Sequence, residues 1–283
     1  MRRKEFKIGC WDVKVDQFDS LPAMKRELEQ LPVFFSCNDY LHEGAVGGRW
    51  EGFKDAEELK LLMNRGITDA KRMTNIRAYA SRDKTRSPSK FTMRTRYEEE
   101  GDDLDVEGFV RKDRKCWIEY YRERKPSDIV DITIVSSAPA DIRASSFDKA
   151  AAIVASCITA LEKKGYKTRI TALRGMCDGD IYAFMVPIKT ERERINFPRL
   201  MFISSTAFVR GVGFTWVTRT HHTYSWGHLG GFDNEFYTEL VHNATGRDEV
   251  NIVDLVRIAQ AIENHRSDEE VIAIAQDMIH YRE

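Results

Sequence analysis

The feature that most constrains the fold of this chain is the β-branched apolar run Ile129–Val135, in which Asp131 and Thr133 are the only polar residues. Successive side chains of a strand point to opposite faces of its sheet, so this run has apolar side chains on both faces. Strands of that kind are typical of parallel sheets, which are covered on both sides. The run therefore predicts a central strand of an α/β sheet.

The residues that follow predict a strand, a helix and a second strand. Ser145-Ser146 opens a helix, Lys163-Lys164-Gly165 ends it, and Lys167–Leu173 reads as the next strand. The apolar face of the helix consists of Phe147, Ala150, Ala151, Val154, Ile158 and Leu161. A helix of this length between two strands favours a right-handed crossover and parallel pairing.

Further elements extend this pattern to the end of the chain. Cys116–Tyr121 and Ile181–Ile188 read as strands, a helix begins near Phe197, and Val250–Val253 reads as a late strand. Two helices follow, the last opened by the capping box Ser267-Asp268-Glu269-Glu270. The expected fold class is α/β, a three-layer sheet with helices on both faces.

The first hundred residues predict a different organisation. Leu21–Leu31 reads as a helix, Asp55 caps a helix that Gly66 ends, and another helix follows from Ile67 to about Tyr79. The polar stretch Ser81–Lys90 reads as a loop. We therefore expect a mainly helical N-terminal region, 1–102, packed on an α/β domain of residues 103–283.

Composition excludes several functional classes. Lys and Arg number 44 against 45 Asp and Glu, a net charge of −1, so the chain has no global basic field for wrapping nucleic acid. The mean hydropathy is −0.48 and no run approaches eighteen apolar residues, which argues against a transmembrane helix or a membrane partner. The N-terminus lacks a signal-peptide core and the five cysteines show no pairing pattern, so we expect a cytoplasmic protein.

Several segments together resemble a known family. They are Gly52–Glu58, Asp105–Val110, the strand ending in Ser136-Ser137, and the Ala-rich helix ending Leu161–Tyr166. Over roughly residues 50–220 they resemble an uncharacterised, mostly bacteriophage-encoded family with a von Willebrand factor A-like (vWA-like) domain. The resemblance implies a vWA-like or Rossmann-like sheet and a role in protein recognition, in the host cytoplasm or in the virion.

The resemblance does not extend to the metal motif of that fold. In vWA domains the first strand ends in Asp-x-Ser-x-Ser, whose oxygens hold a divalent ion. Here the stretch is Ile134–Pro139, which does not supply the Asp and both serines. We therefore expect no cofactor, and keep a divalent metal at Ser136 and Ser137 as an alternative.

Ser136 and Ser137 are the best-placed candidates for binding a ligand, because open α/β sheets gather ligands at the carboxyl ends of their strands. Asp178, in the Asp-Gly sequence between two strands, and Arg199, which follows Pro198, are further candidates. The simpler interpretations are that the serines cap a turn, Asp178 belongs to a hairpin and Arg199 is a surface charge. If a site exists, we expect Ser136, Ser137 and the loop after Leu173 to meet there.

An enzyme is the main alternative to a binding protein. The polar segment from His221 to His228 contains three imidazoles, His221, His222 and His228, and Asp233 follows shortly after. With Ser136 or Ser137 these residues would suit a metal- or serine-dependent hydrolase. However, the histidine spacing matches no zinc motif, and neither serine has the flanking glycines of a nucleophile elbow.

Binding of single-stranded nucleic acid is the second alternative. It would use the cations Arg82, Lys84, Arg86, Lys90, Arg94 and Arg96, which have Phe91 and Tyr97 among them. The acidic run Glu98–Asp103 follows directly and can neutralise this segment. Because no catalytic constellation is complete, the leading hypothesis is a non-enzymatic protein-interaction or scaffold protein, phage-encoded, whose partner is a protein.

Overall fold

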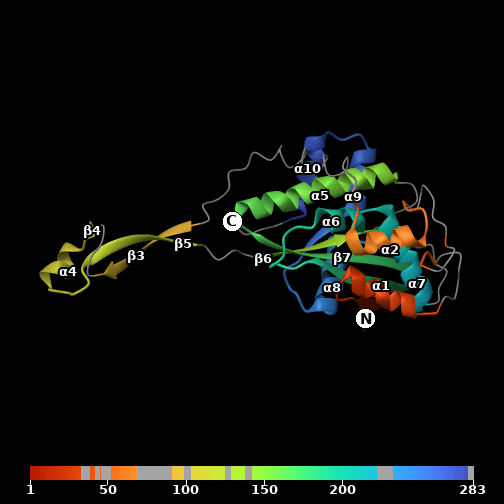
Figure 1. Ribbon diagram of the computed structural model, residues 1–283, viewed down its shortest axis with the longest axis horizontal. Coiled ribbons are helices and arrows are strands. Elements are labelled where there is room, and N and C mark those ends of the chain that lie inside the picture. Colours follow the sequence, from red (N-terminus) through yellow and green to blue (C-terminus); the bar gives the residue numbers. More distant parts are fainter. Residues whose placement is uncertain are drawn as a thin grey trace.

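The computed structural model describes residues 1–32, 39–41, 45, 52–68, 91–98, 103–124, 129–137, 142–221 and 232–279. These residues form a mixed α/β structure with a six-stranded sheet and a separate three-stranded sheet (Figure 1).

The six-stranded sheet has the strand order β1-β2-β8-β7-β6-β9. Its strands are β1 (Arg2–Ile8), β2 (Trp11–Gln17), β6 (Ile129–Val135), β7 (Lys167–Asp178), β8 (Asp180–Lys189) and β9 (Asn251–Asp254). Strand β6 pairs in parallel with both β7 and β9, whereas β7 and β8 are antiparallel. Ile132 and Ile134 are buried, so the predicted central position of this run is confirmed.

Helix α5 (Ala144–Lys164) connects β6 to its parallel neighbour β7. Gly165 ends the helix in the left-handed conformation, with φ 101°, which glycine adopts without a steric penalty. The predicted strand–helix–strand unit is confirmed. Strand β7, however, continues beyond Leu173 to Asp178, because it forms a long hairpin with β8 around Gly179, where φ is 73°.

Helices cover both faces of the six-stranded sheet. The larger set comprises α1 (Leu21–Gln30), α2 (Ala56–Arg65), α5, α6 (Phe197–Ile203), the π-helix η2 (Ala207–Val212), α7 (Gly213–His221), α9 (Leu255–Glu263) and α10 (Asp268–Asp277). Their apolar side chains share one core with Ile132 and Ile134. Helix α8 (Asn234–Thr245) packs on the other face, against Val135 and Leu173 (Figure 1).

Helix α5 is long and apolar enough to pass a length-and-composition test for a membrane span. The bent pair formed by α6 and the segment 207–221 passes the same test. Within the fold, 67% of the most apolar window of α5 is buried against the rest of the protein. Its hydropathy is therefore accounted for by its place in the core.

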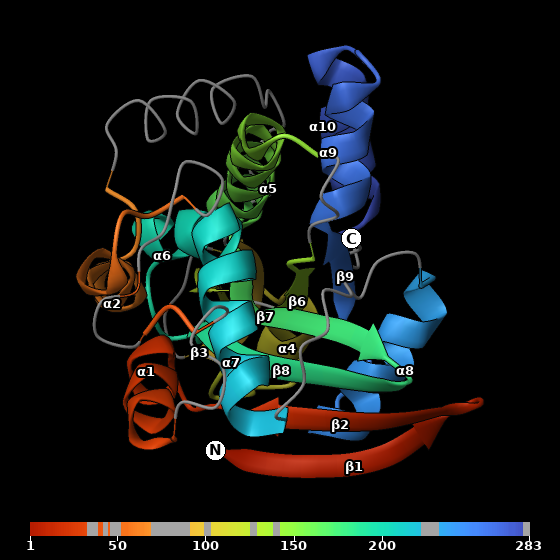
Figure 2. The same cartoon turned by 90° about the vertical axis from the view of Figure 1, so that its right-hand side faces the viewer.

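The expectation of a mainly helical N-terminal region is wrong for the first residues. Strands β1 and β2 form a hairpin, and β2 pairs in parallel with β8, so this hairpin completes one edge of the main sheet (Figure 2). The sequence did not predict the outer strand β1, because its residues Arg2–Glu5 are charged. An edge strand with exposed side chains needs no apolar pattern. Helices α1 and α2 are confirmed, whereas the helix expected from Ile67 and the loop at Ser81–Lys90 lie largely or wholly outside the described residues.

The remaining strands and one short helix form an arm, which we define as residues 91–98 and 103–124. Its elements are β3 (Phe91–Glu98), β4 (Asp103–Leu104), α4 (Val106–Val110) and β5 (Trp117–Arg124), with the strand order β3-β5-β4. The arm lies to one side of the six-stranded sheet (Figure 1). In each sheet, a strand from before residue 102 pairs with a strand from after it: β2 with β8, and β3 with β5. The division of the chain into two domains at residue 102 stays a prediction.

The predicted elements near the C-terminus are also present. Asn196 accepts a hydrogen bond from the N–H of Arg199 at the start of α6, and β9 occupies the predicted late strand. Ser267 and Glu270 form the predicted capping box of α10.

We predict that Ile134→Ala lowers the free energy of unfolding by about 2–5 kcal/mol, because it opens a cavity where β6 packs under α5. The matched control is Ile129→Ala at the other end of the same strand, where the side chain is 47% exposed. We expect that control to change stability by about 0.5 kcal/mol or less. Chemical denaturation measures both, and equal effects would contradict the central position of β6.

Candidate functional site

The three most exposed large apolar side chains of the described residues lie on one short helix, α4. Val106, Phe109 and Val110 are 65%, 59% and 73% exposed. The helix forms here because the carboxylate of Asp105 accepts hydrogen bonds from the backbone N–H groups of Glu107 and Gly108 at 3.1 and 3.2 Å. The cap thus fixes an apolar patch at the surface of the arm.

The ladder of the arm adds two exposed aromatic side chains. Thr95 pairs with Tyr120 and Tyr97 pairs with Ile118 in the antiparallel β3–β5 register. Residues opposite one another, and residues two apart, share a face, so Tyr97 and Tyr120 are diagonal neighbours on one face of the ladder. Both tyrosines are exposed.

The described side chains of the arm form almost no core. Among its described side chains, Cys116 is the only apolar one that is buried. The Arg96 Nε–Glu119 contact of 2.7 Å and the Lys115 Nζ–Glu98 contact of 3.2 Å join exposed or half-exposed groups, and such surface pairs contribute at most about 1 kcal/mol each. Within the described residues, backbone ladders are therefore the main support of the arm, and the apolar side chains of α4 stay exposed.

Ser136 and Ser137 lie, as predicted, at the carboxyl end of β6. The N–H of Ser136 donates to the carbonyl oxygen of Leu173 at 2.8 Å and so extends the β6–β7 ladder by one residue. Both hydroxyls are fully buried and have no hydrogen-bond partner among the described residues. A buried polar group without a partner costs about 1–3 kcal/mol. Within the described residues, the two serine hydroxyls thus retain unused hydrogen-bonding capacity.

Asp254 and Tyr237 belong to the same end of the sheet, and sequence reasoning missed both. Asp254 pairs with Val135 across the β6–β9 ladder, and its carboxylate accepts a hydrogen bond from the N–H of Val256, capping α9. Burial raises the pKa of Asp254, although the N–H donors of α9 oppose this shift. Burial, followed by the nearby Asp254, also raises the pKa of Tyr237. For Asp254, the sequence signal that could have identified it is its position directly after the predicted strand Val250–Val253 and before a helix.

The other predicted ligand residues do not join this site. The loop expected after Leu173 does not exist, because β7 continues along its hairpin. Asp178 lies in the predicted hairpin turn, five residues beyond Leu173, which is about 17 Å at roughly 3.3 Å per residue. Arg199 belongs to the first turn of α6, and no hydrogen bond joins it to either serine.

His221 is part of a buried polar cluster around Asp16. The carboxylate of Asp16 accepts hydrogen bonds from Arg3 Nε at 2.7 Å and Trp216 Nε1 at 3.0 Å, and His221 Nε2 lies 3.3 Å away. The ring of His221 also packs against Tyr182, with the ring centroids 4.5 Å apart. These contacts join the β1–β2 hairpin to the end of α7.

The pKa shifts of this pair have opposing causes. Burial alone would raise the pKa of Asp16, but the hydrogen bonds from His221 and Arg3 outweigh it and lower the pKa. Burial lowers the pKa of His221, although the hydrogen bond with Asp16 opposes this, and the positive charges of Arg3 and Lys14 lower it further. We therefore assign a neutral imidazole that donates to an ionised carboxylate.

The structure does not bring His221 to the serines. Asp16 is on β2 and Ser136 follows β6, with β8 and β7 between them. Three inter-strand spacings of about 4.8 Å separate the two positions by about 14 Å. Asp233 caps α8 on the opposite face of the sheet, while His222 and His228 lie outside the described residues. The hydrolase constellation is therefore not assembled in the described part of the chain.

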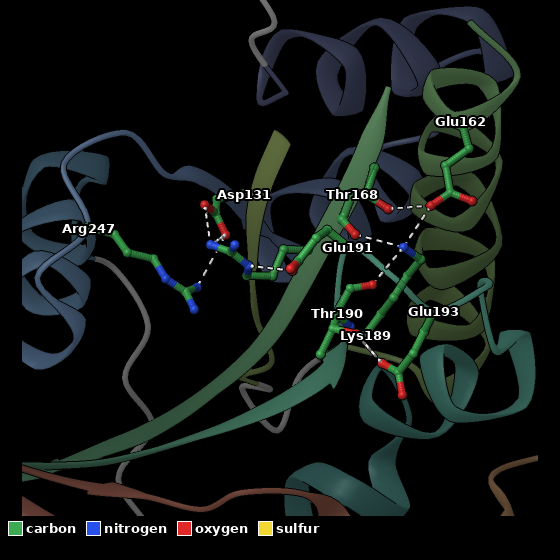
Figure 3. Close-up of polar contacts among 9 residues, drawn as sticks. Asp131, Glu162, Thr168, Lys189, Thr190, Glu191, Glu193 and Arg247 are labelled. Atoms are coloured by element: carbon green, nitrogen blue, oxygen red, sulfur yellow. Dashed lines mark hydrogen bonds and ion pairs between the residues drawn. The ribbon is translucent and has the colours of Figure 1, made fainter. Parts of the chain in front are cut away.

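A second charged network lies at the opposite end of the parallel strands (Figure 3). Asp131 of β6 binds Arg169 at 3.0 Å and Arg247 at 3.3 Å, which ties the segment after α8 to the sheet. Lys189, whose side chain is buried, lies 2.9 Å from Glu162 of α5. Each of these charges has a partner of opposite sign. The network therefore joins the sheet to α5 and to the segment after α8, and is not interpreted as a binding site.

The proposed nucleic-acid segment is described only in part. Arg82, Lys84, Arg86 and Lys90 lie outside the described residues, and only the backbone of Arg94 is described. Arg96 is on β3 and contacts both Glu119 and Glu98. This cation is therefore already neutralised by its own sheet.

A metal centre is not evident in the ranges that the structure describes. No group of three or more His, Cys, Asp or Glu side chains there could hold a metal ion.

Comparison with known proteins identifies one family model, described as a domain of unknown function (DUF7192), which matches residues 8–266. The match covers the arm and the strands of the main sheet from β2 to β9, and leaves out β1 except for Ile8. Searches of curated proteins and of solved structures gave no match.

We predict that the stability of the protein falls as the pH drops below about 6.5, the usual pKa of histidine, because the unfolded chain takes up a proton there before the buried His221 does. The contribution of His221 to this loss levels off below its lowered folded pKa, and each pKa unit of lowering corresponds to about 1.4 kcal/mol. Denaturation at a series of pH values measures this effect.

The variant His221→Gln should remove this pH dependence, because glutamine can still donate to Asp16 and does not titrate. His242→Gln is the matched control, since His242 lies half-exposed on α8. A profile that His221→Gln leaves unchanged would contradict the assignment of a neutral buried imidazole.

Proposed function

The chain belongs to the DUF7192 family, and we propose that it is a non-enzymatic interaction protein that binds a partner protein through the apolar patch of its arm. The patch consists of Val106, Phe109 and Val110. We place this activity in the cytoplasm of a phage-infected host or in an assembling virion.

The exposure of α4 is the observation that carries the proposal. Three adjacent apolar side chains on a capped helix remain in water, on an arm whose own buried residues are too few to cover them. Apolar patches of this kind mark interaction surfaces when the fold has no other use for them. Burial of each side chain against a partner would contribute about 1.5–3 kcal/mol.

The composition of the arm favours a protein partner over nucleic acid. Interfaces between proteins are enriched in aromatic residues, as at Tyr97 and Tyr120, whereas a nucleic-acid site needs cations free to contact phosphates. Arg96 and Lys115 are instead engaged with Glu119 and Glu98.

The same proposal includes a vWA-like fold for the α/β part of the chain. A parallel strand–helix–strand unit, a central strand ending in small hydroxyl residues and helices on both faces support a vWA-like domain. Domains of the vWA-like fold commonly serve in protein recognition, which agrees with the proposed role. The separation of His221 from Ser136 weakens the hydrolase alternative.

We predict that the double variant Phe109→Ser/Val110→Ser loses partner binding while its unfolding free energy changes by about 0.5 kcal/mol or less, since both side chains are exposed. Loss of two buried apolar contacts should weaken the complex at least about 100-fold, or about 2.7 kcal/mol. Quantitative affinity capture from infected cells identifies the partner. Titration of the purified partner then measures the affinity.

The control is Leu61→Ser, which removes an apolar side chain of similar exposure from α2, away from the arm. A photo-reactive residue at position 109 should crosslink to the partner, and one at position 61 should not. Equal capture by the arm variant and the control would contradict the proposal. Capture of nucleic acid that is lost at high salt would favour the nucleic-acid alternative.

A further inference from the structure

Arg174, in the middle of β7, is a cation inside the protein. Its side chain is 2% exposed and points to the face of the sheet that carries η2 and α7. Its Nε donates to the carbonyl oxygen of Val209 at 3.3 Å, and its Nη1 donates to the carbonyl oxygen of Gly175. A Cβ atom on Gly213 would lie 3.2 Å from Nε, so α7 lies directly beside this edge of the guanidinium group.

Arg174 differs from the other buried cations in having no anionic partner among the described residues. Arg219 is paired with Asp39 and Lys189 with Glu162, but no carboxylate in the described part of the chain forms an ion pair with Arg174. Burial, and then the nearby Arg210, lower the pKa of Arg174 to about 10, which still leaves it charged at neutral pH. Carbonyl oxygens do not neutralise a buried charge, and such a charge is costly to keep.

The register places Ser136 beside this guanidinium group. Val135 and Leu173 are partners in the β6–β7 ladder, and both side chains belong to the core under α8. The next residues, Ser136 and Arg174, therefore point to the opposite face, on neighbouring strands about 4.8 Å apart. A buried hydroxyl without a described hydrogen-bond partner and a buried cation without a described carboxylate partner thus occupy adjacent positions at the carboxyl end of β6.

We propose that Arg174 and Ser136 bind a small oxyanion of the phosphate class. Guanidinium groups bind phosphate through two parallel hydrogen bonds, and a serine hydroxyl supplies a further donor. The carboxyl ends of parallel strands are where open α/β sheets bind ligands. The same positive charge disfavours a divalent cation at Ser136, where vWA domains have their metal. Arg174 and Ser136 belong to the six-stranded sheet, so this proposal does not rest on the proposed function of the arm.

Inorganic phosphate is the probe that tests this proposal. At constant ionic strength, phosphate should raise the melting temperature of the full chain and bind stoichiometrically in titration calorimetry. Arg174→Met should abolish both effects. It should also leave the phosphate-free protein as stable as the wild type or more stable, because methionine fills the space without an unpaired charge. Ser136→Ala should weaken binding about tenfold.

The matched control is Arg169→Met, on the same strand but paired with Asp131. It should destabilise the protein and leave the effect of phosphate intact. Acetate in place of phosphate tests for a carboxylate ligand instead, and a response to acetate alone would overturn the phosphate assignment. Absence of phosphate binding by the wild type in calorimetry would overturn the proposal, whether or not the variants fold. A phosphate effect that persists in Arg174→Met would also overturn it.

Discussion

Burial of β6 on both faces is the constraint on which the rest of the fold depends. A strand with Ile132 and Ile134 on one face and Val135 on the other must be covered by two layers. Parallel pairing with β7 requires a crossover, which α5 provides, and β9 closes the other side of β6. As a result, the chain leaves the central strand β6 at Ser136 and Ser137. These residues lie at the carboxyl-terminal end of the parallel strands, where strands end and helices begin.

The charges inside the protein fall into two groups. Asp16 receives hydrogen bonds from Arg3 and Trp216, and the Arg219–Asp39 pair joins α7 to the chain before α2. In these contacts the Coulombic attraction and the hydrogen bonds offset the cost of desolvation, and they connect segments far apart in sequence. Arg174 belongs to the second group, because in the described part of the chain it donates only to carbonyl oxygens and pairs with no carboxylate. That difference is the reason for proposing Arg174, and not Arg219, as a ligand-binding residue.

The arm and the main sheet differ in where their apolar side chains lie. The main sheet buries its apolar side chains between helices, whereas the arm exposes those of α4 and relies on backbone ladders and the Asp105 cap. An isolated sheet of this size is marginally stable unless something covers it. The arm therefore has the properties expected of a surface that is completed by a partner, whereas Ser136 lies buried in the main sheet.

The sequence by itself determined the elements whose pattern is local. These are β6, α5 with its Gly165 stop, the Asp178–Asp180 hairpin and the capping box at Ser267, because apolar periodicity and capping chemistry act within a few residues. Only the tertiary structure decided that the charged strand β1 belongs to the main sheet and that α4 remains uncovered. It alone placed His221 with Asp16, away from Ser136, and set Arg174 beside that serine. Strand order and register fix these neighbours, and both depend on pairing between residues far apart in the chain, which no local pattern encodes.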